Sequence, residues 1–154
     1  MPFTLVHGLA AFLLVLPFTR DKKLLLLAFI GGLTPDMDGL PILFDQNLFY
    51  QLHHVITHPL IAGIIFALIV AFLLTHFLKM DFRPSVLFFF LGFVSHIVTD
   101  LLFTNWPIPL FFPFYNAEFS YPIFLTYSLF FSVAITLLAV IAIVWLLLSK
   151  KAVV

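Results

Sequence analysis

The sequence predicts an all-α fold, a polytopic bundle of membrane helices with about five hydrophobic segments and a short, broken second helix. The composition is the first reason. Hydrophobic residues make up 64% of the chain and charged residues only 9%, whereas soluble domains are about half apolar and about a quarter charged. The 154 residues leave no room for a separate soluble domain. We therefore expect one membrane-embedded domain over residues 1–154.

The hydrophobic segments alternate with short polar breaks. They cover residues 3–18, 24–33, 57–78, 85–103 and 122–148. The second segment has a length of only about 15 Å at roughly 1.5 Å per residue, half of the roughly 30 Å of a bilayer's hydrocarbon core. It stops at Thr34-Pro35-Asp36, and we interpret residues 35–55 and 104–121 as loops.

The basic residues predict the orientation in the membrane. All seven Lys and Arg fall within residues 20–23, 79–83 and 150–151. Five alternating crossings bring these three places to the same side, which the positive-inside rule makes cytoplasmic. We therefore interpret the chain as an integral protein of a prokaryotic cytoplasmic membrane, with the N-terminus outside and the C-terminus inside. The net charge of zero gives no indication of a nucleic-acid partner.

Ionisable side chains interrupt these apolar segments at similar depths. His96 and Asp100 are four residues apart, so they share one face of a helix. An Asp near the centre of a span costs about 2.5–3.5 kcal/mol, which indicates a function. At about 1.5 Å per residue from the cytoplasmic ends, His7, Asp36 and His96 all lie at roughly 18 Å. We therefore expect side chains from four segments to meet in the outer half of the membrane.

Such a cluster indicates a metal site. The chain has no cysteine, so its ligands must be His, Asp or Glu, and imidazole nitrogen with carboxylate oxygen suits zinc. The candidate ligands are His7, Asp36, Asp38, His53, His54, His58, His96 and Asp100. They suffice for one or two divalent ions, and paired ions are common in phosphoester hydrolysis. A hydrogen-bonded cluster that ties the helices together is the structural alternative.

Several motifs in order resemble a known family. They are an early His7, Gly-Leu-Thr-Pro-Asp-Met-Asp at 32–38, His53 with His58, Ser-His-x3-Asp at 95–100 and Phe-Pro-Phe at 112–114. The chain resembles the YdjM-like family of inner-membrane metal-dependent hydrolases, which is distantly similar to zinc-dependent phospholipase C. The resemblance implies that His53 and His58 are ligands, whereas helical spacing favours His54 with His58.

These features predict a membrane-embedded metal-dependent hydrolase with a phospholipase-like site. A membrane lipid or a lipid-linked phosphoester is the expected substrate because the cluster lies in the outer half of the bilayer. Asp38 or Glu118 is the expected proton acceptor. The alternative is a small transporter that uses the same residues to bind a cation or relay protons, since broken helices are also a transporter device. A scaffold with a structural metal is a third possibility.

Overall fold

The computed structural model describes residues 3–149, and within them each hydrophobic segment is mainly helical. The elements are α1 (Thr4–Val15), α2 (Lys22–Leu33), the 3-10 helix η1 (Pro35–Leu43), α3 (Gln46–Leu52), α4 (Leu60–Leu78), α5 (Phe82–Phe103), the 3-10 helix η2 (Leu125–Tyr127) and α6 (Ser128–Ser149). The basic pair at residues 150–151, which the sequence assigns to the cytoplasmic side, lies outside the described residues.

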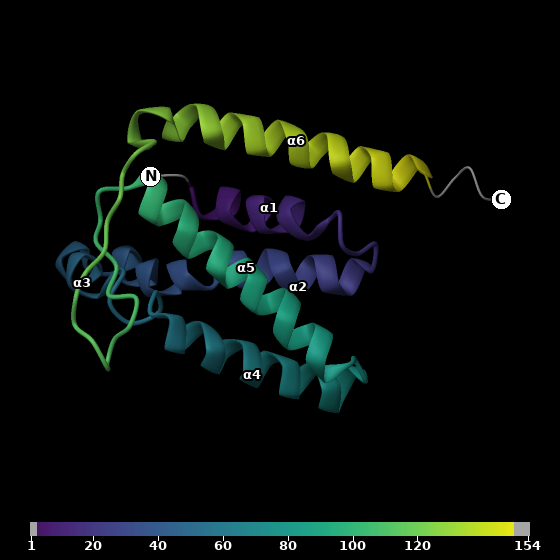
Figure 1. Cartoon of the computed structure of the whole chain (residues 1–154), viewed down its shortest axis with the longest axis horizontal. Helices are drawn as coiled ribbons and strands as arrows, with labels where there is room; N and C mark the ends of the chain where they lie inside the picture. The colour runs from purple at the N-terminus through teal and green to yellow at the C-terminus, as the bar shows by residue number, and fades with distance from the viewer. Residues whose placement is uncertain (1–2, 150–154) are drawn as a thin grey trace.

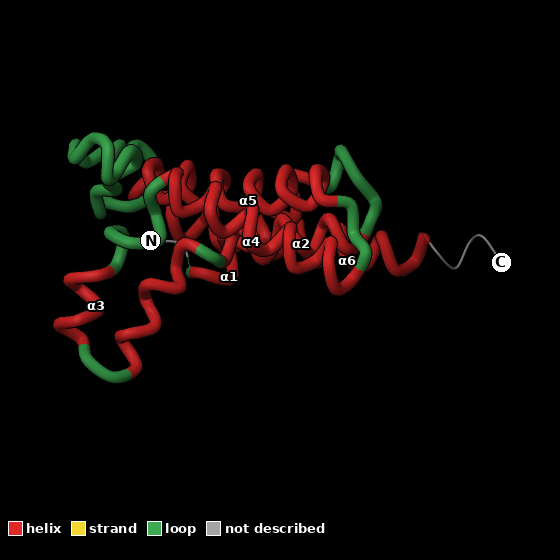
Figure 2. The backbone as a smooth tube through the Cα atoms, turned by 90° about the horizontal axis from the view of Figure 1, so that it is seen from below, coloured by secondary structure: helices red, strands yellow, loops and turns green. Residues whose placement is uncertain are grey.

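The long helices lie side by side along the long axis of the molecule (Figure 1). Helix α5 crosses α2 and packs against α1 and α4, while α6 lies beside α1. Figure 2 shows α3 projecting at one end of the bundle, together with the long loops, away from the described C-terminal end. The bundle therefore has a loop-rich end, and a second end formed by the two short α1–α2 and α4–α5 connections.

Within residues 3–149, three helices are long and apolar enough to cross a membrane: Leu60–Leu78, Phe82–Phe103 and Leu125–Ser149. A fourth span arises if α2 and η1 count as one, although their axes are bent by 56°. Thr4–Val15 is a shorter apolar helix. The predicted all-α polytopic membrane fold is confirmed, with three to four full spans among its five hydrophobic segments.

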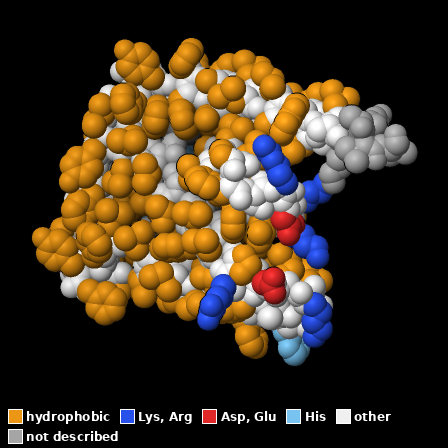
Figure 3. Space-filling model, turned by 45° about the vertical axis from the view of Figure 1, so that its right-hand side comes forward, with side chains coloured by type: hydrophobic (Ala, Val, Ile, Leu, Met, Phe, Trp, Pro, Cys, Tyr) orange, Lys and Arg blue, Asp and Glu red, His pale blue; other side chains and the backbone are white. Residues whose placement is uncertain are grey.

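Apolar side chains cover most of the surface because these helices face lipid. On α6, Leu129 and Phe130 are 70% and 74% exposed in the isolated chain. Figure 3 shows hydrophobic side chains over most of one face, with the Lys and Arg side chains gathered at one end. A single apolar surface with one basic end is what a membrane protein requires.

The segment from Pro35 to Leu52 corrects the sequence interpretation, which treated it as loop. Residues 35–43 form η1, whose first residue is a proline with a pre-set helical φ. Asp45 then caps α3, because its Oδ1 accepts hydrogen bonds from the N–H groups of Asn47 (2.7 Å) and Leu48 (3.3 Å). Both elements form locally, but they are too short to give a periodic hydrophobic pattern.

The break after α2 places Asp36 inside the bundle. Pro35 has no N–H to donate to the carbonyl of Gly31 and its ring excludes a straight α-helical continuation. Thr34 closes the helix, since its N–H contacts the carbonyls of Ile30 (3.1 Å) and Gly31 (3.3 Å). The chain then turns by 56°. As a result, Asp36 lies inside the bundle and is only 8% exposed.

Two glycines bring the backbones of α2 and α5 into direct contact. A Cβ atom on Gly31 would collide with the carbonyl oxygen of Phe89, and one on Gly92 would collide with the carbonyl oxygen of Ala28. Only a residue without a side chain fits either place. This close crossing sets the distance between the end of α2 and the middle of α5, where the buried polar residues lie.

Gly92→Ala is expected to lower the free energy of unfolding by about 3 kcal/mol, the upper end of the usual overpacking cost, because the obstacle is backbone rather than a movable side chain. Thermal unfolding in detergent measures this. Gly39→Ala is the matched control, since its new Cβ would meet nothing closer than 3.5 Å. Equal midpoints for the two variants would contradict the direct backbone contact.

Candidate metal centre

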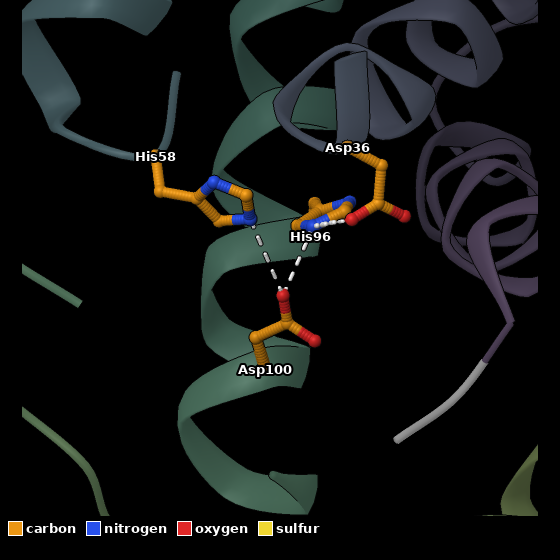
Figure 4. A group of neighbouring side chains, drawn as sticks. All are labelled: Asp36, His58, His96 and Asp100. Atoms are coloured by element: carbon orange, nitrogen blue, oxygen red, sulfur yellow. Dashed lines mark ion pairs between the residues drawn. The ribbon is translucent and has the colours of Figure 1, made fainter. Parts of the chain in front are cut away.

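Asp100 of α5 is the centre of the buried polar cluster. Its side chain and those of His7, His58 and His96 are 0% exposed. The Oδ2 atom of Asp100 lies 3.0 Å from Nε2 of His96 and 3.6 Å from Nε2 of His58. Figure 4 shows both imidazoles directed at this one carboxylate oxygen. The helical i, i+4 spacing therefore places His96 against Asp100, as the sequence predicts.

Three more side chains close the cluster from other elements. Nε2 of His54, in the loop after α3, lies 3.6 Å from Oδ2 of Asp100. Nε2 of His7, in α1, lies 3.4 Å from the other oxygen, Oδ1. Oδ1 of Asp36, in η1, lies 3.5 Å from Nε2 of His96 (Figure 4). The predicted convergence of separate segments is present.

The tautomer of His96 is fixed by its other ring nitrogen. Nδ1 of His96 lies 2.8 Å from the carbonyl oxygen of Gly32. A carbonyl oxygen only accepts hydrogen bonds, so Nδ1 carries the hydrogen. In the neutral ring, Nε2 then presents a lone pair to the carboxylates of Asp36 and Asp100. These atoms repel one another unless a cation or a proton lies between them.

The central atoms lack hydrogen-bond partners. Neither oxygen of Asp36 or Asp100 has one, and the same is true of Nε2 in His7, His54, His58 and His96. An unsatisfied buried polar group costs about 1–3 kcal/mol, and a charged one costs more. One nitrogen or oxygen from each of Asp36, His58, His96 and Asp100 lies within 4.8 Å of the others, so this group could hold a metal ion. An ion there would provide a partner for one atom of each of these four residues.

Asp38 lies behind the loop histidines and is not one of the four residues that could hold the ion. Its Oδ1 lies 2.7 Å from Nδ1 of His53, and its Oδ2 lies 3.2 Å from Nδ1 of His58 and accepts a 3.0 Å hydrogen bond from the N–H of His54. Carboxylates behind metal-binding histidines fix the ring orientation and the tautomer in this way. Asp38 thus braces His58 from the side opposite to Asp100.

The loop between α3 and α4 is shaped to turn its histidines inward. His54 has a φ of 72°, in the left-handed region that few non-glycine residues adopt. The hydroxyl of Thr57 donates to the carbonyl of Pro35 and ties this loop to η1. His58 precedes Pro59, which is the N-cap residue of α4. These contacts hold His54 and His58 against Asp100.

The protonation of the loop histidines follows from burial and from the neighbouring carboxylates. Burial, with some help from the neighbouring His58, lowers the pKa of His54 to about 3, so its imidazole is neutral and can bind a metal. Burial also acts to lower the pKa of His58, but Asp100 and Asp38 outweigh it and raise the pKa to about 9. A metal ion binds the neutral imidazole, so metal binding at His58 would compete with its protonation.

The structure separates the two histidines between which the sequence could not decide. His54 contacts Asp100, whereas His53 pairs with Asp38. The His53 ring also stacks on Phe49, with ring centroids 4.7 Å apart, and its centroid lies 4.8 Å from that of Trp106. That either histidine binds a metal stays a prediction.

Glu118, a predicted proton acceptor, lies apart from the cluster. Glu118 lies exposed in the loop after α5, and among the described residues no hydrogen bond or ion pair joins it to the cluster. Sequence reasoning missed the Gly32 carbonyl as a partner of His96. The adjacent glycines at 31–32 are the signal that could have indicated this close approach.

A pocket of about 350 Å³ lies beside the cluster, on the loop-rich side. Asp36 and His53 supply its polar wall, while Leu43 and Phe49 are among its apolar lining residues. The pocket therefore brings a carboxylate of the candidate metal group and an imidazole into one space.

This fold and this cluster define a polytopic membrane protein with a buried His/Asp group that could bind metal. The model of the YdjM inner membrane protein family matches residues 3–153, and the chain belongs to that family. The match confirms the resemblance that the ordered motifs indicate. Comparison with curated proteins and with solved structures gives no significant match.

Proposed function

We propose that this protein is a metal-dependent hydrolase that acts on a lipid or lipid-linked phosphoester in the outer half of the bilayer. The observation that carries the proposal is the set of buried nitrogen and oxygen atoms that meet around Asp100 without hydrogen-bond partners. Structural polar clusters satisfy their own members. Unsatisfied ligand atoms beside a pocket favour a bound ion and a reacting group.

We assign one ion to Asp36, His58, His96 and Asp100, and zinc fits their nitrogen and oxygen atoms. A bound ion supplies Lewis acidity, which activates water and polarises the phosphoester. Asp100 turns Oδ1 toward His7 and Oδ2 toward the other histidines. This two-sided carboxylate is the reason to propose a second ion as well.

His53, held by Asp38, is our proposed proton acceptor. Its Nδ1 contacts the carboxylate, while its buried Nε2 has no partner and its side chain lines the pocket. An imidazole backed by a carboxylate is the usual general base in hydrolases. This role involves Asp38 through His53, and it replaces the exposed Glu118 as the preferred acceptor.

The orientation is proposed on the distribution of charge. The cluster lies toward the loop-rich end. The basic segments 20–23 and 79–83 lie at the other end, in the connections and the first turns of α2 and α5. With the basic end cytoplasmic, the pocket opens to the outer face, with the N-terminus outside. A substrate that reaches it from the outer leaflet presents its head group to the pocket beside Asp36.

Metal analysis followed by a substrate screen tests the proposal. Protein purified in detergent is expected to contain about one or two equivalents of zinc, lost in His96→Ala. The wild type should then hydrolyse a member of a panel of phospholipids and lipid-linked phosphates, and the variant should not. A protein that takes up no metal on reconstitution would overturn the hydrolase and favour proton-coupled transport by the same residues.

His53→Gln separates the proton acceptor from the ligands. We expect the variant to keep its metal and to lose about 10²–10⁴-fold in kcat, the usual contribution of a general base. Metal content and kcat are measured on the same preparation. Loss of the metal would instead make His53 a ligand, as the family resemblance implies.

A further inference from the structure

A long groove runs between α1, α5 and α6, on the side of α5 away from the His/Asp cluster. It encloses about 810 Å³. Leu13 of α1, Ser95 and Thr99 of α5, and Ile135, Ala142 and Trp145 of α6 are among the lining residues. None of the candidate metal ligands lines it. The groove is thus a separate site from the one that the proposed function uses.

Apart from the indole N–H of Trp145 at one end, the wall of the groove offers no free hydrogen-bonding side chain. Its two hydroxyl side chains both donate within α5: Ser95 Oγ to the carbonyl of Gly92 and Thr99 Oγ1 to the carbonyl of Ser95, each at 2.7 Å. The remaining lining side chains are aliphatic or aromatic, and of these only Trp145 carries a polar atom. A polar occupant would lose its hydrogen bonds to water without replacement, so the groove fits a hydrocarbon chain.

The groove is long enough to hold a lipid chain. Its α6 wall extends from Phe131 to Trp145, which is about 21 Å at roughly 1.5 Å per residue. One leaflet contributes about 15 Å of the roughly 30 Å hydrocarbon core. Helices α5 and α6 are both candidate spans, so the groove between them opens sideways into the acyl chains of the bilayer.

A cation lies at one end of the groove. The guanidinium carbon of Arg20 is 4.6 Å from the ring centroid of Trp145. Arg20 is exposed and forms no ion pair within residues 3–149. Its guanidinium can stack on an aromatic ring and still present N–H donors to a phosphate. The groove therefore combines an apolar channel with a phosphate-binding group at its mouth.

On the other side of α6, a second apolar cavity also has a basic residue in its wall. This cavity of about 340 Å³ lies between α1, α2 and α6, and Lys22 lines it together with Leu146 and Leu147. Arg20 and Lys22 both lie at the basic end of the bundle, which Figure 3 shows as a group of Lys and Arg side chains. A two-chain lipid has this form: two hydrocarbon chains below one anionic group.

We propose that the α1/α5/α6 groove binds one anionic phospholipid from the leaflet at the basic end. Its phosphate contacts Arg20, with Lys22 adding attraction, and an acyl chain lies along Leu91, Leu138 and Ala142. Each basic residue near the surface contributes to the attraction of anionic lipids. The bound lipid would fill the space between α6 and the rest of the bundle, where α6 contacts chiefly α1.

Native mass spectrometry of the detergent-solubilised protein tests this site with added phosphatidylglycerol or phosphatidylcholine. We expect one phosphatidylglycerol to remain bound to the wild type, and phosphatidylcholine to be retained less. Arg20→Gln should weaken retention about five-fold, from the loss of one basic contact. Ala142→Phe should weaken it at least as much, because the new ring fills the channel.

Matched variants make the result specific. Arg83→Gln removes an exposed charge at the same end but outside the groove, and Val144→Phe adds a ring on an exposed face of α6 that lines neither cavity. Both should retain phosphatidylglycerol as the wild type does, and far-UV circular dichroism checks that each variant is folded. Equal retention by all five proteins, equal retention of the two lipids, or a protein dimer in place of the lipid adduct would overturn the proposal.

Discussion

Asp100→Asn is expected to abolish metal binding by the cluster. Asp100 is the only residue of the cluster that contacts four histidines, His7, His54, His58 and His96, at 3.0–3.6 Å. Asparagine keeps the shape of the side chain but removes the negative charge. It also replaces one carboxylate oxygen by an N–H₂ group, which donates hydrogen bonds and offers no lone pair to a metal ion. Metal affinity should fall by more than the about 10–100-fold that follows loss of an outer hydrogen-bond partner.

Metal content by mass spectrometry and a competitive chelator titration measure this loss. His76→Ala is the control, because His76 lies in the last turn of α4, at the basic end, and packs on Phe72 and Phe77 rather than on the cluster. It should bind metal as the wild type does. Full metal content in Asp100→Asn would mean that the ion is bound elsewhere. A loss of metal in His76→Ala would mean that the metal site lies at the basic end of the bundle instead.

The sequence contains enough to predict the fold class and the location of the cluster. Helical rise and bilayer thickness are the same for every span, so His7, Asp36 and His96 could be placed at one depth by counting residues. The i, i+4 rule likewise places His96 on Asp100, and their side chains lie 3.0 Å apart. Both arguments depend only on regular helical geometry, which holds inside a membrane.

The arrangement of the loop histidines could not be predicted in this way. The sequence left His53 and His54 open because the choice depends on the left-handed backbone at His54 and on the contacts of Asp38, which lies 16 residues earlier. The same is true of Gly32, whose carbonyl reaches His96 only because α2 and α5 cross closely. Tertiary contacts decide these details, and no local pattern encodes them.

Asp38→Asn is expected to weaken metal binding without abolishing it. Asp38 accepts hydrogen bonds through both oxygens, whereas asparagine has one oxygen and one donor group, so it cannot serve both His53 and His58. His58 would then lose the contact that holds its hydrogen on Nδ1 and its lone pair toward Asp100. The loss of such an outer partner lowers metal affinity about 10–100-fold.

A chelator titration of Asp38→Asn beside Asp100→Asn distinguishes an orienting residue from a ligand. Asp45→Asn is the control for the same chemical change, since Asp45 is exposed and caps α3, and asparagine is an equally good cap. We expect unchanged affinity in Asp45→Asn, an intermediate affinity in Asp38→Asn and no binding in Asp100→Asn. If Asp38→Asn also binds no metal, Asp38 is itself a ligand.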